Sequence, residues 1–371
     1  MPVIDQPGLN AARKASRETR MLGFREVPSR VVFRGGFQVR KVQRSAGKSG
    51  FQRCGSWRAL ATVLPLLLLA VTAPASAQML RDGPPPQHRV VYRNSVLLRT
   101  NPLGLLDDAR ISYRYRLYLS ESPALRDNFI GIGLAPAVSP AFGRVGLLAE
   151  FQPLSVLGFY AIFERVFYFG VLNFLQSFPS ARSEFSDALL EQRAELPPGS
   201  ALRNYSTSGN QLTLGANLQL KAGPLVGRSQ FRAVRPDYEL REGDRVFYDI
   251  FYDVLAPNRG WFYTNDADLL YQTELGLTLG LRWTVTQALY GPEHFESGEP
   301  QENLNGPMHR LGPILAYTFF QKDGATFNSP TVLLMANWWL SHRYRTGQQV
   351  SSAIPMIAVG VAFTGDLLPV K

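Results

Sequence analysis

The chain has 371 residues and a formal net charge of +10, from 39 Lys and Arg against 29 Asp and Glu. Residues 1–77 hold 13 of the basic residues and three of the acids, so residues 78–371, with 26 of each sign, are neutral overall. The basic excess is therefore no argument for nucleic-acid binding. The single cysteine, Cys54, excludes a disulfide framework or a thiolate metal site for the chain that follows it.

A secretory signal peptide is predicted at residues 51–77. Two arginines precede an apolar run at 59–72, which has the length of a signal core and is short for a membrane span of ~20 residues. An A-x-A cleavage site follows, and we expect the mature chain to begin after Ala77. A single membrane anchor is the alternative. Residues 1–50 are basic and lack apolar periodicity, so we expect a start assigned too far upstream or a disordered extension.

Alternating apolar and polar residues recur through residues 78–371. In ARISYRYRLYLS, residues 109–120, the apolar side chains Ile111, Tyr113 and Tyr115 alternate with arginines, which gives two distinct faces only on a strand. The same period occurs in QLTLGANLQLK (211–221), VFYDIFYDV (246–254), QTELGLTLGLRWTV (272–285) and TVLLMANWWLSHRYR (331–345). Strands of ~9–11 residues with one apolar and one polar face are typical of transmembrane β-barrels.

We therefore predict an all-β protein, a transmembrane antiparallel up-and-down β-barrel over residues 78–371. A soluble β-sandwich or lipocalin-like barrel is the alternative, but its strands usually have ~5–6 residues. Twelve strands are predicted at 88–100, 109–120, 127–139, 142–152, 155–170, 209–222, 224–235, 245–255, 267–287, 309–321, 330–345 and 353–365.

The connections predict an orientation. Bacterial barrels have short periplasmic turns and longer outer loops. With a periplasmic N-terminus, the outer loops are 171–208, 236–244, 288–308 and 346–352, and the tight turns 152–155 and 221–225 lie at the other side. Two features do not fit this parity: the first two outer connections are short, and the connection 256–266 is long for a periplasmic turn.

Two segments allow more than one interpretation. Residues 154–175 are apolar on both faces, which allows a membrane helix, but the charged pair Glu164-Arg165 at the centre favours a bulged or extended strand. Residues 180–196 show helical spacing, with Ser183 as a possible N-cap and two prolines as a stop. We expect a short helix in the long outer loop, either lying over the barrel or entering its mouth.

The inward positions of the predicted strands carry more arginines than carboxylates, and they include Arg99, Arg310 and Glu150. A cationic stripe would favour anions in a pore. The alternative is structural, because arginines in a narrow lumen pair with carboxylates and hold the barrel rigid. The residues predicted to line the pore are Arg93, Arg110, Arg114, Arg116, Arg228, Arg232, Arg282, Arg343 and Arg345, with the acids Asp249, Asp253 and Glu274.

The signal sequence LLLLAVTAPASAQ followed by alternating strands resembles a Gram-negative outer-membrane β-barrel. The resemblance implies an outer-membrane location, contact with outer-membrane lipid and the barrel-assembly machinery, and a porin-like passive channel for small polar or anionic solutes. A closed structural or docking barrel is the alternative. Such barrels usually end on an aromatic residue, whereas here Phe363 precedes a short tail.

A membrane-embedded lipid-modifying enzyme is a third alternative. Ser-His catalysis needs both side chains on one face, but Ser341 and His342 are adjacent on a predicted strand and so face opposite ways. No paired-carboxylate, phosphate-loop or metal-ligand pattern occurs, so we expect no cofactor and no metal.

Overall fold

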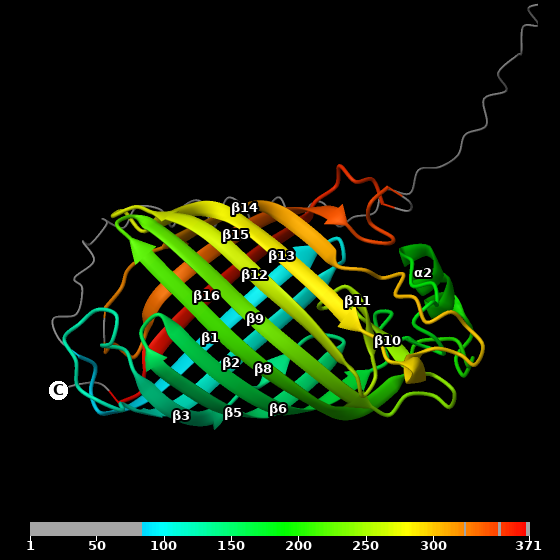
Figure 1. Ribbon diagram of the computed structural model, residues 1–371, viewed down its shortest axis with the longest axis horizontal. Helices are drawn as coiled ribbons and strands as arrows, with labels where there is room; N and C mark the ends of the chain where they lie inside the picture. The colour runs from blue at the N-terminus through cyan, green and yellow to red at the C-terminus, as the bar shows by residue number, and fades with distance from the viewer. Residues whose placement is uncertain (1–83, 323, 348–349, 369–371) are drawn as a thin grey trace, which may run out of the picture. The chain divides into compact units, whose positions relative to one another are not determined.

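Twelve antiparallel strands form a closed barrel in this computed structural model, which describes residues 84–322, 324–347 and 350–368. The predicted extension and signal peptide lie outside the described residues. The first strand, β1 (His88–Thr100), pairs with the last, β16 (Met356–Asp366), from Val91↔Asp366 to Thr100↔Ile357, and with β2 on its other side (Figure 1). The predicted fold class is thereby confirmed.

The other barrel strands follow one another in chain order around the wall. They are β2 (Gly104–Tyr115), β3 (Phe129–Leu134) with its short continuation β4 (Ala137–Val138), β5 (Phe142–Leu154), β6 (Leu157–Phe169), β8 (Ser206–Ala222), β9 (Leu225–Tyr238), β12 (Trp261–Gln272), β13 (Leu277–Leu289), β14 (Met308–Thr318) and β15 (Asn328–Ser341).

Apolar side chains cover the outer face of this wall, and polar ones face the lumen. On β8, Leu214 and Leu218 are each 42% exposed, whereas Gln211 and Thr213, at the alternate positions of the same strand, are buried. On β13, Leu281 is exposed on the outer face and Arg282 turns inward to Asp268. The period-two register predicted for these strands is therefore the observed one.

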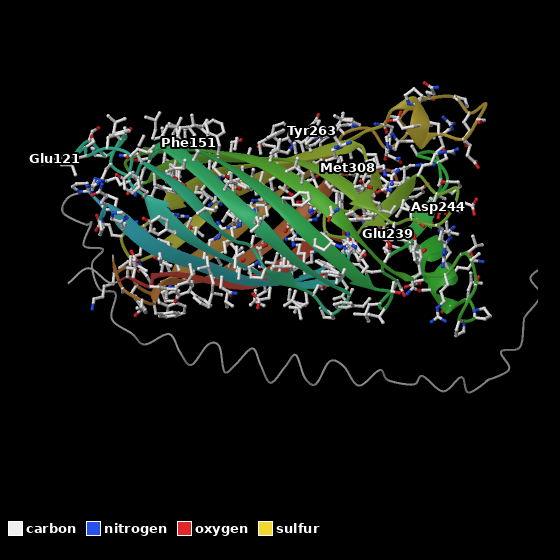
Figure 2. All side chains as sticks on the ribbon, turned by 90° about the horizontal axis from the view of Figure 1, so that it is seen from below. Glu121, Phe151, Glu239, Asp244, Tyr263 and Met308 are labelled. Atoms are coloured by element: carbon white, nitrogen blue, oxygen red, sulfur yellow. The ribbon has the colours of Figure 1, made fainter. Side chains whose placement is uncertain are left out.

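The two ends of the barrel differ. One, the tight-turn end, carries the shortest connections, and Glu121 marks it in Figure 2. The opposite, long-loop end carries Glu239 and Asp244. The tight-turn end has the turns 155–156, 223–224 and 273–276 and the longer connections 116–128 and 319–327. The long-loop end has 170–205, 239–260, 290–307 and 342–355, and also the short turns 101–103 and 139–141.

The predicted strand 267–287 is two strands, β12 and β13, joined by the turn Thr273–Gly276. Gly276 has a φ of +82°, which favours glycine, and the Thr273 hydroxyl bonds to the backbone of Leu277. Leu275 in this turn keeps the alternation of leucines in phase, so the pattern continues through the chain reversal and hides it.

The predicted strand 245–255 is wrong, because these residues are not part of the barrel wall. They form the hairpin of β10 (Val246–Asp249) and β11 (Val254–Pro257), which joins β7 (Ser177–Phe178) in a separate three-stranded sheet. All residues of β10 and β11 are buried on both faces, whereas a barrel strand exposes one face to lipid. This error and the merged strand cancel, so the predicted total of twelve holds.

The predicted loop helix is present as α2 (Asp187–Glu195). Its N-cap is Ser186, whose hydroxyl accepts from the Leu189 amide at 3.3 Å, and not Ser183 as predicted. The helix predicted as an alternative near Glu164 is instead strand β6. Within the described part of the chain, none of the helices has the length and apolar character needed to cross a membrane.

Candidate functional site: the lumen and its closed mouth

The hairpin of β10 and β11, residues 246–257, fills the long-loop end of the lumen, and we call it the plug hairpin. Phe247, Val254 and Ala256 are fully buried. The Tyr252 ring lies 4.9 Å from that of Phe262 on the wall. The hydrophobic cluster around the hairpin takes side chains from seven wall strands, namely Leu106, Phe142, Val166, Val234, Phe262, Ala288 and Met308.

Buried polar contacts fix the plug hairpin in place. Arg99 on β1 donates to the carbonyl oxygens of Ile250 and Phe251, the latter at 2.7 Å. The carboxylate of Asp253 accepts from Arg345 Nε at 2.6 Å and from the Tyr248 hydroxyl at 2.7 Å. Burial alone would raise the pKa of Asp253, but the charge of Arg345 outweighs it and holds that pKa well below its usual range. The hairpin is therefore anchored by an ionised pair.

Four residues predicted to line the pore belong to this closure, and their predicted positions are wrong. Asp249 and Asp253 lie in the plug hairpin, and burial raises the pKa of Asp249. Arg343 and Arg345 follow the end of β15. Arg345 also binds Asp187 of α2 through both Nη atoms at 2.8 and 2.9 Å, while Arg343 donates to backbone and amide oxygens of the loops. They hold the mouth shut.

Below the plug hairpin, the predicted residues Arg228, Arg232 and Arg282 face the lumen, and each meets a carboxylate. Asp268 binds Arg228 at 2.5 Å and Arg282 at 2.7 Å, and Asp266 binds Arg232 at 2.5 Å. Asp266 was missed because it precedes the predicted strand 267–287, and Asp268, although inside that strand, was not assigned to the lumen. The alternation in WFYTNDADLLYQ, residues 261–272, was the signal that could have found them.

Toward the tight-turn end, a cavity of about 180 Å³ lies inside the barrel, and we call it the vestibule. Arg93, Arg110 and Arg114 line it, as does Glu150. Arg114 binds Glu150 through two bonds of 2.9 and 3.0 Å. Arg110 reaches Asp108 only at 3.9 Å. Arg93 is exposed to the lumen and forms no ion pair within the described residues.

The opposite wall of the lumen is apolar at this depth. Val226, Leu270, Ile314, Met335 and Ala358 form a buried cluster from five strands. At this depth, polar residues of β1, β2, β5 and β6 line one part of the lumen, and this apolar cluster from β9, β12 and β14 to β16 lines another. The arginines therefore do not form a continuous cationic ring around the lumen at this depth.

Two further predicted pore residues lie elsewhere. Glu274 is exposed in the turn between β12 and β13. The predicted strand 267–287 is interrupted there, because β12 ends at Gln272. Arg116 lies one residue beyond β2 and donates to the backbone carbonyl of Pro85 at the rim of the tight-turn end. Neither lines the lumen.

The histidine beside Ser341 has no catalytic geometry. His342 Nε2 lies 3.2 Å from the carbonyl oxygen of Asp253, and its Nδ1 accepts from the Tyr344 amide at 3.1 Å. Both ring nitrogens thus bind backbone groups of the closed mouth. Burial lowers the pKa of His342. Over residues 84–322, 324–347 and 350–368, no group of three or more His, Cys, Asp or Glu side chains could hold a metal ion.

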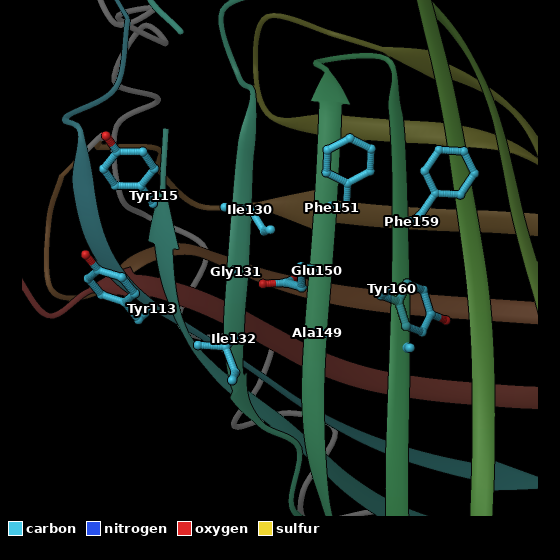
Figure 3. A pocket seen from close by; sticks show the side chains of 11 residues that line it. Tyr113, Tyr115, Ile130, Gly131, Ile132, Ala149, Glu150, Phe151, Phe159 and Tyr160 are labelled. Atoms are coloured by element: carbon cyan, nitrogen blue, oxygen red, sulfur yellow. The ribbon is translucent and has the colours of Figure 1, made fainter. Parts of the chain in front are cut away.

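A second hollow, of about 640 Å³, lies on the outer face of the same wall. Figure 3 shows the rings of Tyr113 and Tyr115 on one side of it and those of Phe151 and Phe159 on the other. The small side chains of Ala149 and Ala161 leave space between them. The hollow is open and apolar, as a lipid-facing surface is expected to be.

Comparisons with known proteins find no matching family model and no matching curated protein. Solved structures that are similar include a KdgM porin, at 10% identity over 74% of this chain and 98% of that one with a TM-score of 0.32. The translocator domain of the autotransporter NalP from Neisseria meningitidis is 12% identical over 84% of this chain and 96% of that one, with a TM-score of 0.35. The monoaromatic hydrocarbon channel CymD is 11% identical over 78% of this chain and 89% of that one, with a TM-score of 0.32. At these values no ligand or activity is transferred to this chain.

Proposed function

We propose that the protein is a channel of the Gram-negative outer membrane for small anionic solutes, and that the plug hairpin closes it at the long-loop end. The observation that carries the proposal is the guanidinium of Arg93, which is exposed to a cavity inside the barrel and has no ion-pair partner among the described residues. A lumen built only for rigidity would pair it, as it pairs Arg228 and Arg282. An unpaired cation raises the local concentration of anions.

The location follows from the predicted signal peptide and the lipid-facing leucines and aromatic residues. The tight-turn end faces the periplasm and the long-loop end faces outward. Outer-membrane lipid covers the outer face, and the barrel-assembly machinery reads the last strand, with Phe363 as its terminal aromatic residue. An epitope tag beside Glu195 should be detected on intact cells, and one beside Gly223 only after the outer membrane is opened. The reverse pattern would invert the proposed topology.

A closed structural or docking barrel is the second candidate. The burial of the plug hairpin favours it, because Phe247, Val254 and Ala256 are fully buried and Arg99 and Arg345 bind the hairpin from different loops and strands. In that case the vestibule arginines would serve no transport.

Conductance in planar bilayers separates the two candidates. We expect wild-type protein to open rarely, and Asp253→Asn to open more often, because it removes the charge that Arg345 holds in the mouth. Asp237→Asn is the matched control, since the ion pair of Asp237 with Arg259 is exposed at the surface. Wild-type protein that never conducts at any voltage would favour the closed barrel, whatever the variant does.

A further inference from the structure

The vestibule contains an unusual arrangement of like charges. Arg93 on β1 and Arg110 on β2 are direct cross-strand partners, and both side chains line the same cavity. Like charges placed directly opposite each other destabilise a sheet. An anion between the two guanidinium groups would remove this cost.

The carboxylates around the vestibule are already committed to other arginines. Asp108 binds Arg144 at 3.1 Å, and Glu164 also binds Arg144, at 3.4 Å. Glu150 holds Arg114 in a two-bond pair. None of these carboxylates forms an ion pair with Arg93, and the only one that pairs with Arg110 is Asp108, at 3.9 Å. In addition, Nε of Arg110 is buried without a hydrogen-bond partner.

Uncharged groups complete the lining. The Arg110 guanidinium lies 4.7 Å above the ring of Tyr160. That ring packs against bare backbone at Gly215, where a Cβ would lie 2.1 Å from the ring carbon Cζ, so the glycine is what allows the tyrosine to lie there. The amide of Asn217 faces the same cavity. The ring thus orients the arginine, whose side chain is 19% exposed.

We propose that the vestibule is a binding site for one small oxyanion, held between Arg93 and Arg110. This inference rests on the proposed function, because it names the class of solute that the channel would select. Guanidinium groups are planar forks that match the paired oxygens of a carboxylate or a phosphate better than a spherical chloride ion. A cavity of about 180 Å³ admits a small oxyanion with a few water molecules and excludes a large one.

Isothermal titration of the purified protein in detergent tests the site, with inorganic phosphate and acetate as probes against a constant chloride background. The two probes distinguish a phosphate from a carboxylate as the preferred ligand. We expect saturable binding by wild type, and at least about a tenfold loss in Arg93→Gln, because charge-assisted hydrogen bonds are lost. The thermal midpoint of this variant should not fall, because Arg93 leaves no carboxylate unpaired.

Lys221→Gln is the matched control, because Lys221 is an exposed cation on the same barrel but does not line the cavity. We expect its affinity to stay within about twofold of wild type. Absence of saturable binding, or equal binding by Arg93→Gln, would overturn the site. The titration does not depend on ion conduction, so it separates the two proposals. Binding without conductance would refute the channel but support the binding site. Conductance without binding would refute the binding site but support the channel.

Discussion

Replacing Asp253 by Asn should loosen the plug hairpin. Removing one partner of a fully buried ion pair costs ~3–5 kcal/mol, because the other charge is left without compensation. Here Arg345 keeps its two bonds to Asp187, whose side chain is 44% exposed and so only partly desolvated. We therefore expect a smaller cost of about 2–3 kcal/mol for the closed mouth.

A single cysteine reports this opening. Ala256 is fully buried in β11, and Cys54 lies in the predicted signal peptide, so Ala256→Cys gives the mature chain one thiol. A loss of about 2–3 kcal/mol in closure should raise the rate of its labelling by a water-soluble maleimide about 30- to 150-fold.

The control is again Asp237→Asn. Its ion pair with Arg259 is exposed on both sides, and we expect the labelling rate to change by less than about threefold. If Asp253→Asn also leaves the rate unchanged, or if the thiol reacts at once in the unaltered background, the hairpin is not held by this pair and the reasoning is refuted.

Three further predictions concern the wall and the plug hairpin. Leu279→Arg should destabilise the barrel by about 2–4 kcal/mol in lipid vesicles if the residue lies near the midplane, and a result near zero would contradict the assigned lipid face. Asp268→Asn should lower the free energy of unfolding by about 3–5 kcal/mol, because Asp268 binds both Arg228 and Arg282. Arg228→Gln should lower it by less, because Asp268 then still binds Arg282. Equal losses in the two variants would contradict the sharing of Asp268 by both arginines. Because burial raises the pKa of Asp249, the fold favours its neutral form, and this contribution is lost as pH rises through the raised pKa. Asp249→Asn should therefore raise the thermal midpoint at pH 8 more than at pH 5, and an equal change at both would be evidence against this.

Strand register was predictable from the sequence because one physical rule governs it. A residue on the wall faces either lipid or the lumen. On β8, leucines alternate with Gln211 and Thr213, so only one register places the leucines toward lipid and the polar residues toward the lumen. The same rule failed at Thr273–Gly276, where a leucine in the turn happened to keep the phase. Periodicity reports the face of a residue and not the direction of the chain.

The closed mouth could not be predicted, because it depends on contacts between distant segments. The alternation in residues 246–254 is the same whether the segment is a lipid-facing strand or a hairpin buried on both sides. Which arginines stay unpaired is equally non-local. Arg93 and Arg228 look alike in the sequence, and only the position of Asp268 on a neighbouring strand distinguishes them.

The zero-current potential of wild-type protein across a bilayer with a KCl gradient tests the central claim most directly. If Arg93 and Arg110 of the vestibule face the conducting path, the potential will have the sign of chloride preference. It will move toward zero in Arg93→Gln and at high salt, where the screening length falls to about 3 Å at 1 M. A potential with the sign of potassium preference, or one that Arg93→Gln leaves unchanged, would contradict the account.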